Sequence, residues 1–272
     1  MANAKKYGVI GSPIEHSLSP LIHKAFAKEF NLEISYEKIH APQNAFAEIV
    51  SKFFNHNGQG LNVTLPHKFN AFEFCDRHTP MAARLNCVNT IKIDEDQRLV
   101  GHNTDALGLI YDLEINHSIN IEDKSILIIG AGGAASGILL PLFEKKPCSL
   151  TLTNRTMDNA LKLINLFGLK NQINCLAADE LHAPFDLIIN TSSAGLSNQT
   201  FNIPRQIITN NTVCYDLNYD PKSLSFLDFA REQNAFECID GWGMLVEQAA
   251  YSFEWWHGTR PDTSNVKHLK PS

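Results

Sequence analysis

The most informative chemical feature of this sequence is a glycine-rich loop near the middle of the chain. The apolar run 125–129 (SILII) leads directly into Gly130, Ala131, Gly132, Gly133 and Ala134. A buried strand that turns through a G-x-G-x-x-A loop into a helix is typical of a site for the pyrophosphate of a dinucleotide. The chemistry indicated is therefore the binding of a dinucleotide cofactor.

Each small residue of this loop has a physical role in binding an anion. Gly130 permits a tight turn, Gly132 lets backbone N–H groups approach an anion, and the small Ala135 lets the next helix pack near the strand. A helix is expected over 134–143 and a second strand over 149–153, which is the spacing of a βαβ unit. These neighbours favour a dinucleotide site over an ordinary strand-to-helix turn.

The end of the second strand indicates which dinucleotide is bound. An NAD site usually places an acidic residue there, whereas this chain has Asn154, Arg155 and Thr156. A guanidinium and a hydroxyl bind a 2′-phosphate that a carboxylate would repel. The alternative is that Asn154 caps a helix and Arg155 is only solvated. We predict NADP rather than NAD.

Composition excludes several classes of protein. The chain has 272 residues with 44% hydrophobic content, which suits two domains, and its net charge of −6 argues against nucleic-acid binding. Its six cysteines form no C-x-x-C motif and its histidines no H-E-x-x-H, so we expect reduced thiols, a cytoplasmic location and no metal. We also expect no signal peptide and no membrane span.

The pattern of residues predicts an α/β fold throughout. Before residue 106 we expect strands over 7–11, 34–39 and 61–65, helices over 20–30 and 45–54, and a hairpin of 88–93 with 99–102. Ser19 is the expected N-cap of helix 20–30, whose apolar face is Leu21, Ala25, Phe26 and Phe30. The last strands are expected over 187–189 and 213–215, and the tail beyond residue 257 as loosely ordered.

Polar residues gather at the ends of these elements, where ligands of α/β proteins usually lie. Taken singly, each has an ordinary explanation: Lys68 as a surface lysine, or Asp105 as a helix cap. Seven motifs in order make a stronger case. They are Ser17-x-Ser19, Asn62-Val63-Thr64-x-Pro66-x-Lys68, Asn89-Thr90, Gly101-x-Asn103-Thr104-Asp105, the glycine-rich loop, Asn154-Arg155-Thr156, and Asp240-Gly241-x-Gly243-Met244 with Gln248-Ala249.

With these motifs the chain resembles the shikimate dehydrogenase family along nearly its full length. The resemblance implies reversible NADPH-dependent reduction of 3-dehydroshikimate to shikimate, in the biosynthesis of chorismate and the aromatic amino acids. It implies an N-terminal α/β substrate domain (1–106), a Rossmann-type NADP-binding domain (107–243), and a C-terminal helix with its tail (244–272) that returns to the substrate domain.

The resemblance also implies roles for single residues. Lys68 is the catalytic lysine and Asp105 its carboxylate partner; we hypothesise that Lys68 stabilises and protonates the oxyanion that hydride transfer creates, although a water could deliver the proton. The substrate carboxylate is assigned to Ser17, Ser19 and Tyr219, and its hydroxyls to Thr64, Asn89 and Gln248. The nicotinamide pocket is assigned to Leu217 and Gly241, and Ser192 is assigned to the cofactor site. Ser192 replaces a threonine of the family, and Asn159 replaces a common second basic residue, which weakens the expected grip on the 2′-phosphate.

Two other functions stay open at this point. One is a quinate/shikimate dehydrogenase with looser choice of substrate and of NAD or NADP. The other is a non-catalytic NADP-binding regulator, which would need neither Lys68 nor Asp105. The expected partner is a small molecule, with no nucleic acid and no membrane, and the chain is expected to be a monomer or a homodimer.

Overall fold

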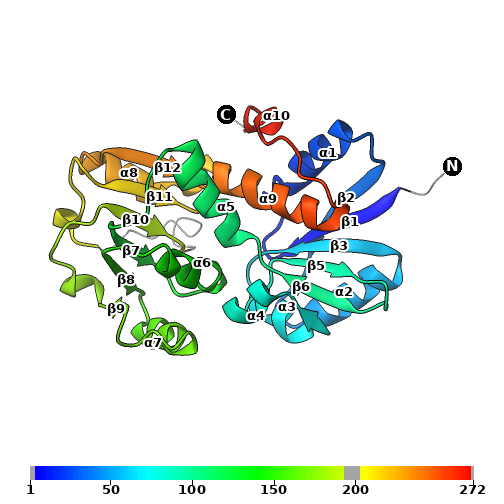
Figure 1. Ribbon diagram of the computed structural model, residues 1–272, viewed down its shortest axis with the longest axis horizontal. Coiled ribbons are helices and arrows are strands. Elements are labelled where there is room, and N and C mark those ends of the chain that lie inside the picture. Colours follow the sequence, from blue (N-terminus) through cyan, green and yellow to red (C-terminus); the bar gives the residue numbers. More distant parts are fainter. Residues whose placement is uncertain (1–3, 193–202, 271–272) are drawn as a thin grey trace. The chain divides into compact units, whose positions relative to one another are not determined.

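Two β-sheets organise the chain, and each belongs to a separate structural unit. A computed structural model describes residues 4–192 and 203–270 (Figure 1). The first unit comprises Met1–Leu109 with Leu245–Pro271, and the second comprises Ile110–Met244. The mixed α/β fold expected from the sequence is confirmed.

The first unit is built on a six-stranded mixed sheet. Its strands are β1 (Lys5–Gly11), β2 (Ile34–His40), β3 (Gly58–Val63), β4 (Arg77–His78), β5 (Thr90–Ile93) and β6 (Leu99–His102), in the order β2-β1-β3-β5-β6-β4. Strand β1 is parallel to β2 and β3, whereas β5 and β6 form the expected antiparallel hairpin. The helices are α1 (Ser19–Glu29), α2 (Phe46–Asn55), α3 (Lys68–Phe74), α4 (Pro80–Leu85) and α5 (Asp105–Tyr111).

Helix α1 corrects two expectations. Its N-cap is Leu18, and Ser19 already lies in the first turn, where its N–H donates to the Ser17 hydroxyl (3.3 Å). The buried face contains Ile22, His23 and Phe26, whereas Leu21 is 42% exposed. The expectation counted only apolar residues. It therefore missed His23, which is buried by stacking on the Tyr36 ring at 4.5 Å.

The long helix α9 (Trp242–His257) belongs to the first unit from Leu245 onward, as the expected return implies. Its Phe253 side chain is fully buried, with ring centroids 5.8 Å from those of Phe26 and Phe30. Further along, Trp256 donates from Nε1 to the Ile91 carbonyl (3.1 Å). Aromatic packing and this bond attach α9 to α1 and to the sheet.

The tail after α9 is ordered, so the expectation of a loose tail is wrong for residues 258–270. It forms the short helix α10 (Ser264–Lys267), which lies beside α1 (Figure 1). The Glu247 side chain of α9 is fully buried, and its carboxylate contacts Arg260 (3.2 Å), Lys267 (3.3 Å) and the Thr263 hydroxyl (2.9 Å). A buried carboxylate requires such partners, and the apolar pattern of the sequence does not reveal them.

The second unit is built on a parallel sheet. Its strands are β7 (Ser125–Ile129), β8 (Ser149–Thr153), β9 (Asn174–Cys175), β10 (Leu187–Asn190), β11 (Val213–Asp216) and β12 (Glu237–Asp240), in the order β12-β11-β10-β7-β8-β9. This is the strand order of a dinucleotide-binding fold, with its switch point between β7 and β10. The helices are α6 (Gly133–Glu144), α7 (Met157–Leu166) and α8 (Ser225–Glu232).

Two strands of this sheet were not expected. Strand β9 has only two residues, and β12 begins and ends with acidic residues, so neither has the apolar run of a buried strand. The expectation that 213–215 is the last strand is therefore wrong. Short helical turns complete the unit: a π-helical turn at Asp112–Asn116 and 3₁₀ turns at Ala178–Glu180, Arg205–Ile207 and Pro221–Ser223.

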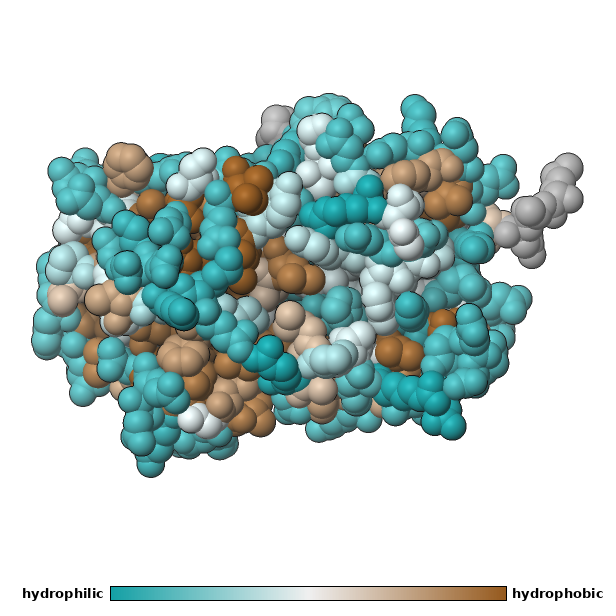
Figure 2. Space-filling view, viewed as in Figure 1, coloured by the Kyte–Doolittle hydropathy of each residue, from teal (hydrophilic) through white to brown (hydrophobic). Residues whose placement is uncertain are grey.

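The surface is mixed in polarity. Figure 2 shows hydrophobic residues interspersed among hydrophilic ones on the face in view. In the second unit the large apolar side chains of Phe236 and Ile115 are 70% and 61% exposed. Among the helices that the structure describes, none is both long enough and apolar enough to cross a membrane.

The Glu247 cluster generates a prediction about stability. Either Arg260→Ala or Lys267→Ala leaves the Glu247 carboxylate with one of these two cations, whereas the double variant removes both. We expect the double variant to lose about 3–5 kcal/mol of unfolding free energy, more than the sum of the singles, because an uncompensated charge stays buried. Urea denaturation measures this loss.

Two controls accompany this measurement. Adding Glu247→Gln to the double variant should restore much of the stability, because the buried charge is removed. Arg231→Ala breaks an exposed ion pair with Asp228 and should cost less than about 1 kcal/mol. A purely additive double variant would contradict the prediction.

The buried His23 generates a second prediction, on acid stability. Burial lowers the pKa of the His23 ring from 6.5 to about 3. Below pH 6.5 the unfolded chain therefore binds a proton that the folded chain does not, so stability falls as the pH falls. At pH 5 the protonation of this ring in the unfolded chain lowers the free energy of unfolding by about 2 kcal/mol. His23→Phe should flatten the pH dependence of urea unfolding between pH 6.5 and 5.

The exposed His182 provides the matched control, since His182→Asn should leave the slope unchanged. An unaltered slope in His23→Phe would show that other groups carry the acid lability.

Candidate active site

Two residues that lie 37 positions apart meet in the first unit. Lys68 is the first residue of α3 and Asp105 the first of α5, and Lys68 Nζ lies 2.7 Å from Asp105 Oδ2. The two side chains are only 12% and 6% exposed. Taken alone, Lys68 could have been a surface lysine and Asp105 a helix cap, whereas the structure buries both side chains in one site. The bond uses one of the three ammonium N–H groups and leaves the others able to bind an oxygen.

Asn89 joins this pair to α9. Its Nδ2 donates to Asp105 Oδ1 (2.9 Å), Thr104 Oγ1 (2.9 Å) and Gln248 Oε1 (3.3 Å). Its Oδ1 accepts from the Thr104 N–H (2.9 Å) and the Thr90 hydroxyl (2.8 Å). The structure thus brings four residues named from the sequence, Lys68, Asn89, Asp105 and Gln248, into one hydrogen-bonded group.

A buried hydroxyl that the sequence analysis missed supports this group. Ser252 lies four residues after Gln248, on the same face of α9. Its Oγ contacts Asn62 Nδ2 (3.0 Å), Thr90 Oγ1 (2.8 Å) and Thr104 Oγ1 (3.2 Å), and it donates to the Gln248 carbonyl (3.1 Å). The helical spacing of four from Gln248 was the signal that could have found Ser252.

The two serines bond to each other, because the Ser17 hydroxyl donates to Ser19 Oγ (3.3 Å) and the Ser19 N–H donates to Ser17 Oγ (3.3 Å). Burial raises the pKa of the Tyr36 phenol well above its usual range, so it stays neutral and donates to Asn62 Oδ1 (2.7 Å). Thr64 is half-buried, with its N–H bonded to the Ile10 carbonyl (3.0 Å).

In the second unit the glycine-rich loop lies at the switch point of the sheet. Gly130 has a φ of +111°, and a Cβ there would lie 2.6 Å from Thr191 Oγ1. Gly132 faces open space, since a Cβ on it would meet nothing within 4 Å. Gly133 begins α6, with Ala134 next, and Ala135 is fully buried. An unobstructed loop at a helix N-terminus suits an anion such as pyrophosphate.

The residues after β8 form an exposed turn. Asn154 is half-buried and donates from Nδ2 to the Thr156 carbonyl (2.8 Å), whereas Arg155, Thr156 and Asn159 are exposed. Helix α7 has Thr156 rather than Asn154 as its N-cap. The alternative of Asn154 as a helix cap is therefore wrong, and its amide instead holds the turn that presents Arg155.

Ser192 of the cofactor site and the residues assigned to the nicotinamide follow the ends of neighbouring strands. Ser192 donates from its N–H (3.1 Å) and its hydroxyl (2.7 Å) to Asn190 Oδ1 at the end of β10. Leu217 follows β11 and Gly241 follows β12, and a Cβ on Gly241 would lie 2.2 Å from the Leu217 carbonyl oxygen. Only glycine fits this approach. Tyr219, half-buried, lies two residues beyond Leu217 in the second unit.

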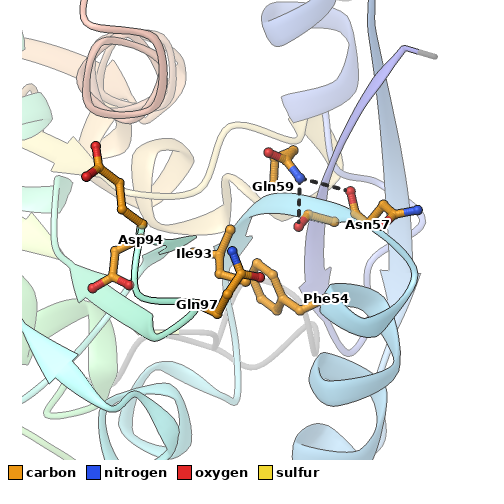
Figure 3. A pocket seen from close by; sticks show the side chains of 8 residues that line it. Phe54, Asn57, Gln59, Ile93, Asp94 and Gln97 are labelled. Carbon is orange, nitrogen blue, oxygen red and sulfur yellow. Dashed lines mark hydrogen bonds between the residues drawn. The ribbon is translucent and has the colours of Figure 1, made fainter.

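The described residues contain no group of three His, Cys, Asp or Glu side chains suited to a metal ion. A cavity of about 290 Å³ lies between the end of α2 and the β5–β6 hairpin (Figure 3). It is lined by Phe54, Asn57, Gly58, Gln59, Ile93, Asp94, Glu95 and Gln97, none of which is a predicted site residue.

A parallel sheet with a glycine-rich loop at its switch point, together with a second α/β unit that buries a lysine–aspartate pair, defines the class of two-domain, dinucleotide-binding dehydrogenases. Three family models match this chain. They are the shikimate dehydrogenase substrate binding domain over residues 9–91, shikimate/quinate 5-dehydrogenase over 113–230, and the shikimate 5′-dehydrogenase C-terminal domain over 241–268.

Curated relatives and solved structures agree with these models. The chain is 44% identical over 268 residues, 98% of both chains, to shikimate dehydrogenase (NADP(+)) of Legionella pneumophila strain Corby. It is 41% identical over 261 residues, 96% of both, to that of Alkalilimnicola ehrlichii. The crystal structure of an Ael1 enzyme from Pseudomonas putida matches with a TM-score of 0.89 and 36% identity over 99% of both chains.

A crystal structure of a shikimate dehydrogenase in complex with NADP+ matches with a TM-score of 0.88 and 30% identity, over 98% of this chain and 96% of that one. This chain belongs to the shikimate dehydrogenase family. The resemblance drawn from the motifs is thereby confirmed.

Proposed function

We propose that this chain catalyses the reversible NADPH-dependent reduction of 3-dehydroshikimate to shikimate, a step in chorismate and aromatic amino acid biosynthesis. The relatives that match it over nearly their full length are named shikimate dehydrogenase (NADP(+)). The single observation that carries the activity is the buried pair of Lys68 and Asp105 at 2.7 Å. A regulator that only bound the cofactor would gain nothing from burying this pair.

The chemistry of the reaction explains the pair. NADPH supplies the hydride, and the ketone oxygen of the substrate becomes an alkoxide that needs a positive charge and a proton donor beside it. Lys68 provides the ammonium group that stabilises this oxygen. Asp105 holds the ammonium in place through Oδ2, while Asn89 fixes its other oxygen. The carboxylate also keeps an acceptor site for a ring hydroxyl of the substrate.

The remaining residues of the first unit would orient the substrate. We assign its carboxylate to the Ser17 and Ser19 hydroxyls, together with Tyr219 of the second unit, and its ring hydroxyls to Thr64, Asn89 and Gln248. Several neutral donors that converge on one ligand fix its orientation, so that the reacting carbon faces the nicotinamide. The hydrogen bonds that join Asn89, Gln248 and Asp105 support this assignment, because they hold the three side chains in one arrangement.

The second unit would hold NADP. The backbone N–H groups of the loop 130–134 suit the pyrophosphate, and the exposed turn of Asn154, Arg155 and Thr156 suits the 2′-phosphate. Asn159 lies one helical turn further on and adds a neutral contact there. Ser192, Leu217 and Gly241 would line the nicotinamide. The open space beside Gly132 supports the assignment, since it leaves the loop backbone accessible.

A cytoplasmic location and a monomeric or homodimeric state complete the proposal. The location is supported by the cysteines, all six of which are free thiols.

Initial rates with shikimate and with quinate, each with NADP and with NAD, test the function. We expect fast turnover with shikimate and NADP. Comparable rates with quinate or NAD would identify the quinate/shikimate dehydrogenase instead, and no rate in any of the four assays would favour the regulator.

Arg155→Ala should raise the KM for NADP about ten- to hundredfold, because a charge-assisted bond contributes about 1.5–3 kcal/mol.

The exposed Lys162 of α7 provides the matched control for Arg155. Lys162→Ala should leave the KM for NADP unchanged, and equal effects of the two variants would argue against a specific phosphate contact.

Substitution of the lysine tests the catalytic assignment. Lys68→Ala should lower kcat about 10²–10⁴-fold, the usual contribution of a positioned acid–base group, with a much smaller change in KM. Asp105→Asn keeps the shape of the side chain and should also lower kcat, because the ammonium loses its ionic partner. The exposed Lys24 of α1 serves as control, since Lys24→Ala should retain wild-type kcat. Wild-type turnover in Lys68→Ala would refute the assignment.

A further inference from the structure

A buried carboxylate lies at the carboxyl end of an interior strand of the sheet in the second unit. Asp216 ends β11 and pairs in register with Asn190 of β10 and with Asp240 of β12. Its side chain is fully buried. Its Oδ1 accepts three N–H groups: Asn190 Nδ2 (3.1 Å), the backbone N–H of Asn218 (3.0 Å) and Asn218 Nδ2 (2.8 Å).

The second oxygen of this carboxylate has a different environment. Asp216 Oδ2 is buried, and no donor among the described residues reaches it. Burial, together with the smaller effect of the like charge of Asp240, raises the pKa of Asp216 to about 6 against the opposing effect of the Asn190 and Asn218 donors. Among the described residues, the groups that act on Asp216 from neighbouring segments are one carboxylate on β12 and neutral amides on β10 and after β11. Two charge states of Asp216 are therefore accessible near neutral pH.

The two asparagines bound to Asp216 contact three residues of the proposed cofactor site. Asn190 Oδ1 accepts from the Ser192 N–H (3.1 Å) and hydroxyl (2.7 Å), and the Asn190 carbonyl accepts from the Leu217 N–H (3.0 Å). Asn218 donates from Nδ2 to the Ser192 carbonyl (3.3 Å), and its own carbonyl accepts from the Gly241 N–H (2.9 Å). Ser192 is therefore one hydrogen bond from each side-chain amide that Asp216 orients, whereas Leu217 and Gly241 bond to the main-chain carbonyls of the same two asparagines.

We propose that Asp216 is a positioning residue for the nicotinamide half of the cofactor, and that its ionised form locks Asn190 and Asn218 in the arrangement that binds this half. The inference rests on the proposed function, because that function assigns Ser192, Leu217 and Gly241 to the nicotinamide. An ionised carboxylate accepts stronger hydrogen bonds than a neutral acid. A proton on Oδ2 removes the charge and thereby weakens all three bonds to Oδ1.

Binding of NADP and of 2′-phospho-ADP-ribose between pH 5.0 and 7.5 tests this proposal, with calorimetry or fluorescence as readout. Both ligands carry the pyrophosphate and the 2′-phosphate, which itself titrates near pH 6, but only NADP carries the nicotinamide. We expect the ratio, the dissociation constant of NADP divided by that of the ligand without nicotinamide, to rise about tenfold from pH 7.5 to 5.0 in the wild type. In Asp216→Asn, a neutral isostere that keeps Oδ1, the ratio should be independent of pH and close to the wild-type value at pH 5.0.

A second variant keeps the test decisive if Asp216→Asn does not fold. Asp240→Asn removes the facing charge and keeps an oxygen for the Trp242 N–H, so the midpoint of the pH dependence should move to lower pH. A ratio that does not change with pH in the wild type overturns the inference while leaving the proposed function intact. Failure of 2′-phospho-ADP-ribose to bind at any pH would instead overturn the proposed NADP site.

Discussion

The structure depends on the requirement that a buried carboxylate be surrounded by donors. Four carboxylates meet this requirement in different ways. Asp105 binds the Lys68 ammonium, Glu247 binds two cations of the tail, and Asp216 binds neutral amides. Asp112 accepts from the Tyr215 hydroxyl (2.7 Å) and Asn116 Nδ2 (2.6 Å), beside Gly243, where a Cβ would lie 2.0 Å from Asp112 Oδ1. Each carboxylate thereby holds together segments that are distant in the sequence.

Helix α9 links two of these clusters within the first unit. Successive residues of a helix point about 100° apart, so Glu247 and Gln248 belong to different faces. Glu247 meets the tail, whereas Gln248 and Ser252 meet Asn89, Thr90 and Thr104. The tail therefore fixes the rotation of the helix that presents Gln248 to the lysine–aspartate pair, and the helix needs both contacts to define one orientation.

Local patterns predicted the parts of the fold that local physics determines. The apolar run 125–129, its glycine-rich loop and the hairpin of β5 and β6 are each specified by residues close together in the sequence. Ser252, Asp216 and Glu247 were missed, because the burial of a polar side chain depends on partners far away. The bond from Asn62 to Ser252, for example, spans 190 positions. On α1 the buried Phe26 was predicted, whereas His23 was missed for the same reason, since it is buried against the rings of other segments.

The hydroxyl pair of Ser17 and Ser19 bears on which substrates the first unit accepts under the proposed function. Each hydroxyl has one proton: the Ser17 hydroxyl donates to Ser19 Oγ, and the Tyr36 hydroxyl donates to Asn62 Oδ1. A carboxylate that binds both serines must take the Ser17 proton away from Ser19. A charge-assisted hydrogen bond is roughly twice as strong as a neutral one, so an acid more than compensates for this exchange. A neutral ligand offers only an equal bond in return. Under the proposed function, the serine hydroxyls would therefore favour an acid without a positive charge beside its carboxylate, and the Lys68 ammonium would be left to act on the reacting oxygen.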